Sequence, residues 1–109
     1  MSIVITGASG EFGRLAAASI LEVVPAEDVI LVSRSPDSLD EFREKGMDVR
    51  YGDFDEPESL LKAFAGAERA LIISTVSVGE QRRLQHSNAI EAAKESGIRQ
   101  VAYTSSVGI

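Results

Sequence analysis

The chain has 109 residues, of which 44% are hydrophobic and 26% charged, and its formal net charge is −6. This length and composition fit one globular domain and exclude fibrous and disordered classes. The negative charge argues against nucleic acid as a partner, because neutralising its phosphates requires a basic surface. With no cysteine and one histidine, disulfides, thiolate metal sites and cysteine nucleophiles are excluded, and we expect no metal site.

The N-terminus begins with Met1 and reaches the apolar residues Ile3, Val4 and Ile5 almost at once, without the basic and apolar regions of a signal peptide. No apolar run approaches the length that spans a bilayer. We therefore expect a cytoplasmic protein with no membrane span.

The first predicted strand covers residues 2–6 and ends at a glycine. A continuous apolar run of this kind is typical of a strand that is covered on both faces in a parallel sheet. A helix follows, ended by Pro25. The residues at helical spacing that predict its inner face are Phe12, Leu15, Ala16, Ser19 and Ile20.

A second strand is predicted over residues 28–33 (DVILVS). Ser35–Pro36 predicts the start of the next helix, because serine can cap it and proline at its first position loses no hydrogen bond. Leu39 and Phe42 would form the inner face, and Gly46 would end the helix.

A weaker strand is predicted over residues 47–51. Asp55 and Glu58 have the spacing of a capping box, and Gly66 would end the helix that they begin. The apolar residues Leu60, Leu61 and Phe64 follow this start.

The last predicted elements are a strand over residues 70–74, a helix over residues 81–96 and a fifth strand over residues 101–104. The helix ends at Gly97, and its alanine-rich face contains Ala89, Ala92 and Ala93. Five strands that alternate with four helices, joined by right-handed crossovers, predict an α/β fold, a Rossmann-like doubly wound parallel sheet of five strands over residues 1–109. We expect it to be truncated before a substrate domain, since such folds normally continue after the fifth strand.

The segment Thr6–Gly13 (TGASGEFG) lies between the first strand and the first helix. Gly7, Gly10 and Gly13 give the spacing G-x-x-G-x-x-G. A pyrophosphate needs main-chain N–H groups without a Cβ in the way, and the helix N-terminus adds a favourable dipole. The strand before the glycines and the helix after them favour a phosphate loop over a plain turn of small residues.

Arg34 stands at the end of the second strand, where an acidic residue would hold the ribose 2′-hydroxyl of NAD. An arginine fork matches a phosphate bidentately, so this position favours the 2′-phosphate of NADP. The alternative is a solvent-exposed arginine at the start of a loop.

Two further strand ends carry candidate ligand contacts. Asp53 could accept a hydrogen bond from the adenine amino group, with Phe54 against the ring, or the two could simply start a turn and join the core. Ser74 and Thr75 end the fourth strand at the carboxyl edge, where ligands of such sheets bind, although they could be plain loop residues. His86 is expected to be inert, and the role of residues 104–106 stays open.

With these residues in place, the chain resembles the short-chain dehydrogenase/reductase superfamily, in particular its atypical NmrA-like branch and, within it, the type-two NAD(P)H:quinone oxidoreductases. The resemblance covers the whole chain. It rests on TGASGEFG, on Arg34, on the Gly52-Asp53 turn and on the stretch SVGEQRRLQHSNAIEAAKESGIRQVAYTSS. The last stretch is the most specific, because the glycine motif is shared by the superfamily at large.

The resemblance implies binding of NADP(H) and hydride transfer to a quinone or similar carbonyl. The residues that would contact the pyrophosphate and neighbouring ribose are Gly7, Ser9, Gly10, Glu11, Phe12 and Gly13. Arg34 would take the 2′-phosphate, Asp53 and Phe54 the adenine, and Ser74 and Thr75 the nicotinamide-side ribose. The catalytic residues are unknown, since the segment that would hold a Tyr-x-x-x-Lys dyad lies beyond residue 109.

Because the smaller substrate domain is missing, we expect this chain alone to bind cofactor but to be inactive, and to associate through its uncovered fifth strand. Two other interpretations stay open. The branch includes proteins that sense the NADP/NADPH ratio without turnover, and the chain could be an excised or engineered scaffold without ligand binding.

Overall fold

A computed structural model describes residues 2–7, 11–73 and 79–103. The five strands are β1 (Ile3–Thr6), β2 (Val29–Ser33), β3 (Asp48–Tyr51), β4 (Arg69–Ile72) and β5 (Gln100–Tyr103). They form one sheet in the order β3-β2-β1-β4-β5, and every neighbouring pair is parallel. The chain therefore starts in the centre and winds outward to each side, which confirms the expected α/β doubly wound architecture.

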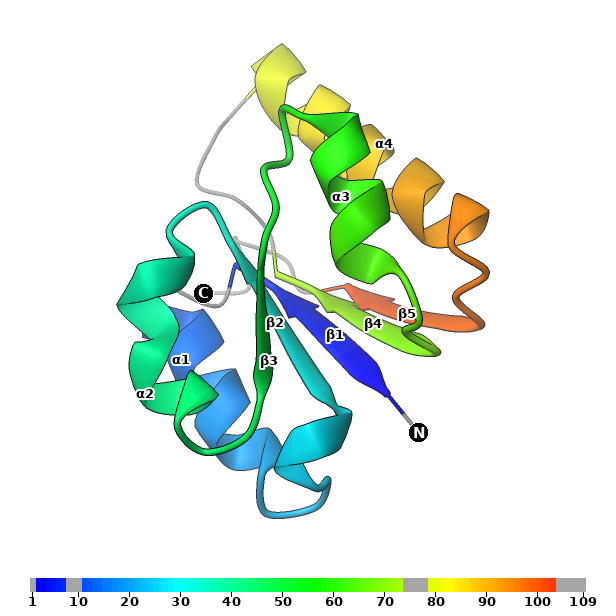
Figure 1. Ribbon diagram of the computed structural model, residues 1–109. Coiled ribbons are helices and arrows are strands. Elements are labelled where there is room, and N and C mark those ends of the chain that lie inside the picture. The colour runs from blue at the N-terminus through cyan, green and yellow to red at the C-terminus, as the bar shows by residue number, and fades with distance from the viewer. Residues whose placement is uncertain (1, 8–10, 74–78, 104–109) are drawn as a thin grey trace.

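Helices cover both faces of this sheet. They are α1 (Glu11–Ile20), α2 (Asp40–Arg43), α3 (Pro57–Phe64) and α4 (Gly79–Glu95), with two 3₁₀ segments, η1 (Ala26–Asp28) and η2 (Pro36–Leu39). Figure 1 shows α1 and α2 on one face, and α3 and α4 on the other. Successive strand residues point to opposite faces, so Val4 packs in the α3/α4 cluster and Ile5 in the α1/α2 cluster.

The predicted inner face of α1 is confirmed at Ala16 and Ile20, which pack against the α1/α2 cluster, and is wrong at Leu15 and Ser19. Leu15 is 65% exposed and Ser19 is also exposed, whereas Gly13 and Ala17 are buried. Small residues on the buried side allow α1 to lie close to the sheet, and the larger leucine is turned outward as a result. The helix also ends at Ile20, before Pro25, and the intervening residues form hydrogen-bonded turns.

The start of α3 also differs from the prediction. Glu56 occupies the position before the helix, Pro57 is its first residue, and no side chain caps it. Asp55 does not act in a capping box; its carboxylate accepts hydrogen bonds of 3.2 and 3.3 Å from Nε2 of Gln85 on α4. The proline supplies the fixed φ that begins the helix, so no capping side chain is needed to define its start.

The other helix boundaries follow the prediction more closely. Ser35 and Pro36 do stand at the beginning of η2, but the Ser35 side chain makes no capping hydrogen bond. Gly46, Gly66 and Gly97 have φ values of +101°, +84° and +77°, the left-handed conformation that ends helices and that glycine adopts without strain.

Candidate functional site

The centre of the carboxyl edge is formed by the ends of β1 and β4. Thr6 is 1% exposed, and its Oγ1 accepts a hydrogen bond of 3.1 Å from the N–H of Ile73. Gly7 turns the chain away with φ +66°. A Cβ there would lie 3.5 Å from the Ile73 Cβ, an ordinary contact, so the backbone conformation is what requires glycine at this position.

The predicted phosphate loop is described by the structure only at its two ends, Gly7 and the first turn of α1. Ser9 and Gly10 lie outside the described residues, as do the side chains of Glu11 and Phe12. The backbone of Glu11 begins the helix, and Gly13 is buried in its first turn. The N-terminus of α1 therefore follows β1 after a short loop, the arrangement in which main-chain N–H groups and the helix dipole favour an anion.

Arg34 directly follows the end of β2 and is exposed. The strand end beneath it is fixed, because the buried Ser33 accepts a hydrogen bond of 2.9 Å at Oγ from the N–H of Ser35. Within the ranges that the structure describes, no side chain pairs with the Arg34 guanidinium. Its donors are therefore open to an anion that approaches from the carboxyl edge.

Gly52 brings the end of β3 close to the end of β2. Its N–H donates a hydrogen bond of 3.0 Å to the carbonyl of Ser33, and a Cβ at this position would lie only 2.4 Å from Cγ1 of Val32. A side chain larger than hydrogen does not fit this contact. Arg34 and Asp53 follow these two strand ends at the same edge of the sheet.

Asp53 forms a local turn and Phe54 packs against the core, as in the alternative in which neither residue contacts a ligand. Oδ1 of Asp53 accepts a hydrogen bond of 2.8 Å from the N–H of Asp55, a local turn that aspartate commonly forms. Phe54 is partly buried against the α3/α4 cluster. The adenine contact therefore stays a prediction for both residues.

The loop that carries Asp53 and Phe54 is held by groups that the sequence did not single out. Nδ2 of Asn88 donates a hydrogen bond of 2.8 Å to the Phe54 carbonyl, and Gln85 donates to the Asp55 carboxylate. Oγ of Ser59 accepts from the N–H of Asp53 at 2.9 Å. The polar side of α4 thus supports a loop at the far side of the sheet edge.

Tyr51 is a second feature that the sequence analysis missed. Its side chain is 44% exposed, and the hydroxyl donates a hydrogen bond of 2.8 Å to Oε2 of Glu56. The hydrogen bond to Glu56 raises the pKa of the phenol, and desolvation and the charges of Glu56 and Asp53 act in the same direction. The charge of Arg34 lowers that pKa, so it opposes the other contributions.

Ser74 and Thr75 lie outside the described residues, as do residues 104–106 and the side chain of His86. The predicted site residues that the structure places at the carboxyl edge are therefore those that follow β1, β2 and β3.

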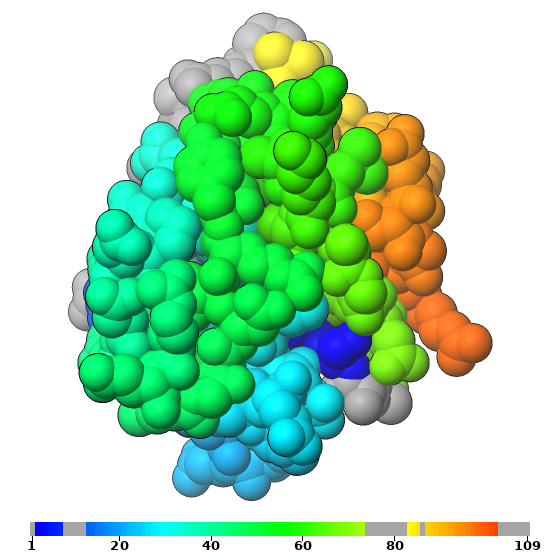
Figure 2. Space-filling model, viewed as in Figure 1, coloured from blue at the N-terminus to red at the C-terminus, as the bar shows by residue number. Residues whose placement is uncertain are grey.

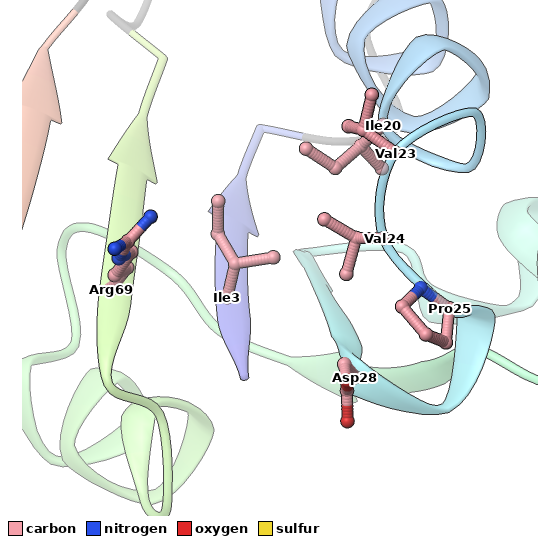
Figure 3. A pocket seen from close by; sticks show the side chains of 7 residues that line it. All are labelled: Ile3, Ile20, Val23, Val24, Pro25, Asp28 and Arg69. Carbon is pink, nitrogen blue, oxygen red and sulfur yellow. The ribbon is translucent and has the colours of Figure 1, made fainter. Parts of the chain in front are cut away.

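A cavity of 370 Å³ lies at the opposite, amino edge of the sheet (Figure 3). Its lining residues are Ile3, Ile20, Val23, Val24, Pro25, Asp28 and Arg69. Figure 3 shows Ile3 of β1 between Arg69 of β4 and the turn that follows α1. The lining is mostly apolar, with Asp28 and Arg69 as its charged residues, and it lies away from the carboxyl edge, so we assign the cavity no role in cofactor binding.

The described residues hold neither a cluster of metal ligands nor a membrane-spanning helix. Histidine, aspartate and glutamate do not gather there into a group of three that could hold a metal ion. No helix among these residues is long and apolar enough to cross a membrane.

Comparison with known proteins gives consistent matches. The profile of the NAD(P)H-binding family matches residues 7–109. Quinone oxidoreductase 2 of Escherichia coli (strain K12) is 39% identical over 103 residues, which are 94% of this chain and 36% of that protein. An NmrA-like family domain-containing oxidoreductase of Aspergillus flavus is 33% identical over 108 residues, 96% of this chain and 35% of that protein.

Solved structures agree with these matches. The Citrobacter sp. triphenylmethane reductase complexed with NADP(H) superposes with a TM-score of 0.91 at 36% identity, covering 94% of this chain and 36% of that one. The E. coli NADPH-dependent quinone oxidoreductase complexed with NADPH superposes with a TM-score of 0.89 at 39% identity, with the same coverage. The chain thus spans about a third of the length of the relatives that it matches.

Proposed function

Because the chain belongs to the NAD(P)H-binding family, we propose that it binds the dinucleotide across the carboxyl edge of its sheet and prefers NADP(H). The order β3-β2-β1-β4-β5 reverses direction between β1 and β4, and ligands of open α/β sheets bind at such a switch point. Gly7 and the beginning of α1 lie at this point. The observation that carries the NADP(H) preference is the exposed Arg34 at the end of β2, with no pairing side chain among the described residues.

The proposed contacts follow the strand ends. Main-chain N–H groups of the loop would hold the pyrophosphate, and the residues involved are Gly7, Ser9, Gly10, Glu11, Phe12 and Gly13. Arg34 would bind the 2′-phosphate through charge-assisted hydrogen bonds. Asp53 and Phe54 would contact the adenine, and Ser74 and Thr75 the nicotinamide-side ribose.

Calorimetric titration of the chain with NADPH and NADH tests this assignment. Arg34→Ala is expected to weaken NADPH binding by about 1.5–3 kcal/mol, the range for hydrogen bonds to charged groups, and to leave NADH binding almost unchanged. Arg43→Ala is a matched control, because Arg43 is an exposed arginine that pairs with Asp40 on α2. Equal losses for both cofactors in Arg34→Ala would remove this residue from the 2′-phosphate role.

For the whole protein we propose NADPH-dependent reduction of a quinone or similar carbonyl, supported by the likeness to quinone oxidoreductase 2. The bound nicotinamide supplies the hydride, which requires an acceptor held a few ångströms away in a site that excludes water. Residues 1–109 would supply the cofactor site but not this enclosure. Turnover of NADPH with a quinone by the longer protein tests the proposal, and tight cofactor binding without turnover would favour a regulatory sensor instead.

We also propose that this chain associates with a second copy through the edge strand β5. Val101 is 43% exposed on that edge, and an edge strand offers free N–H and C=O groups to another strand. A stable monomer in gel filtration at micromolar concentration would contradict this. The compartment stays a proposal as well: a sequence without cysteine is compatible with a reducing cytoplasm, and cell fractionation tests it.

A further inference from the structure

Arg34, Tyr51 and Glu56 all lie at the outer corner of the carboxyl edge, where β2 and β3 end. Ser33 and Tyr51 are register partners in the parallel pair β2–β3, so Arg34 follows the residue that lies beside Tyr51. Figure 2 shows the segment from β3 to the beginning of α3 on the surface, next to the segment of η2 and α2. At this corner the charge of Arg34 lowers the pKa of Tyr51, against the larger contributions that raise it.

The acidic groups of this corner are already engaged in local hydrogen bonds. The Tyr51 hydroxyl donates to Oε2 of Glu56 at 2.8 Å, and Oδ1 of Asp53 accepts from the N–H of Asp55. Glu56 stands at the position before α3, where its side chain makes no capping hydrogen bond. Tyr51 is thus the group that fixes the Glu56 carboxylate.

A carboxylate that was not fixed would compete for Arg34. Arginine and carboxylate form a favourable forked pair, which uses the same donors that a phosphate requires. The competing carboxylate would also place a negative charge beside the phosphate. Both effects would weaken the binding of a cofactor with a 2′-phosphate, and neither would change the binding of a cofactor without it.

We propose that Tyr51 is a specificity-determining positioning residue: by holding the Glu56 carboxylate, it keeps the Arg34 guanidinium available for the 2′-phosphate of the cofactor. This inference rests on the proposed NADP(H) preference. It assigns Tyr51 no contact with the cofactor itself.

Titration of the chain with NADPH and NADH in four forms tests the inference: wild type, Tyr51→Phe, Glu56→Gln and the double variant. Tyr51→Phe keeps the ring and removes only the hydroxyl. It is expected to weaken NADPH binding roughly two- to fivefold, the range of an exposed ion pair that now competes, with NADH binding unchanged. Glu56→Gln should bind NADPH at least as well as the wild type, and the double variant should regain the wild-type affinity.

The outcomes separate the alternatives. A double variant as weak as Tyr51→Phe would overturn the inference in favour of a direct hydroxyl contact with the cofactor. Equal weakening for NADPH and NADH would reduce Tyr51 to a structural role. If Tyr51→Phe leaves NADPH binding unchanged while Arg34→Ala weakens it, only this inference fails. A wild type that binds NADPH no better than NADH removes the proposed preference and the inference together.

The hydrogen bond itself has its own readout in the ultraviolet titration of the tyrosines. The chain has two tyrosines, so subtracting the Tyr51→Phe curve isolates the Tyr51 phenol, which should titrate above the ordinary value of about 10. Because the raised pKa belongs to the folded state, the bond is present at neutral pH and is lost as the pH rises through the raised value. Glu56→Gln should move the titration toward the ordinary value; an unmoved curve would contradict the pairing.

Discussion

The two edges of the sheet are built from the same strands and differ in almost every chemical respect. At the amino edge, Ile3 begins β1 and lines a largely apolar cavity. At the carboxyl edge the same strand ends in Thr6 and Gly7, which fix a turn with a side-chain hydrogen bond and a left-handed glycine. The strand interior supplies stability to both edges, so the difference in function comes from one or two residues at each strand end.

The strongest test of the carboxyl edge is Gly52→Ala. The new Cβ would lie 2.4 Å from Cγ1 of Val32, and overpacking of this kind is expected to lower the free energy of unfolding by about 2–3 kcal/mol. Urea unfolding measures the loss. In the double variant with Val32→Ala the two costs should be less than additive, because the clashing methyl group is gone; full additivity would show that the clash is not the cause.

A smaller loss is expected from Thr6→Val, which keeps the shape of the side chain and removes the acceptor of the Ile73 N–H. Leaving that buried donor unsatisfied should lower the free energy of unfolding by about 1–2 kcal/mol. Thr6→Ser is the matched control, since it keeps the hydroxyl oxygen. If the serine variant loses as much as the valine variant, the hydrogen bond does not account for the effect.

Two glycines with positive φ, one near each edge of the sheet, allow the effect of a substitution on stability to be distinguished from its effect on cofactor binding. Gly7 has φ +66° and Gly66 has φ +84°, with nothing within 4 Å of the position of a Cβ at Gly66. Alanine at either position should lower the free energy of unfolding by about 1 kcal/mol, the cost of a left-handed conformation. Only Gly7→Ala should weaken dinucleotide binding. Equal dinucleotide affinity in both variants would contradict the proposal that Gly7 belongs to a phosphate-binding loop.

The smallest effect is expected from Arg69→Ala on the wall of the amino-edge cavity. As an exposed substitution it should change the free energy of unfolding by less than about 0.5 kcal/mol, with NADPH affinity unchanged in the same calorimetric titration. A loss of NADPH affinity in this variant would indicate that the cofactor binds at the amino edge, and would contradict the assignment of the binding site to the carboxyl edge.

Patterns between near neighbours in the sequence predicted most of the fold. Short apolar runs gave the five strands, and Gly46, Gly66 and Gly97 marked helix ends because a left-handed φ is a local property. The buried side of α1 could not be predicted in this way: the large Leu15 is exposed and the small Ala17 is buried, since close approach to the sheet favours small residues over the most hydrophobic one.

In the candidate site, too, features that depend on local sequence could be predicted and contacts between distant segments could not. Gly7 and Arg34 could be predicted as site residues because their positions relative to strand ends carry the signal. The pairing of Tyr51 with Glu56 and that of Asn88 with the Phe54 carbonyl could not. These contacts arise from the path of a loop and the packing of a distant helix, and no spacing in the sequence encodes them.

The hydrogen bonds of Gln85 and Asn88 mean that α4, the helix that follows β4, carries the loop after β3. A small rotation of α4 would therefore displace Asp55 and the Phe54 carbonyl, which lie in the loop after β3 on the same face of the sheet. A displacement of the chain near β4 would therefore be transmitted by α4 to the loop after β3. The strands β1 and β2, which lie between β4 and β3, would not have to move.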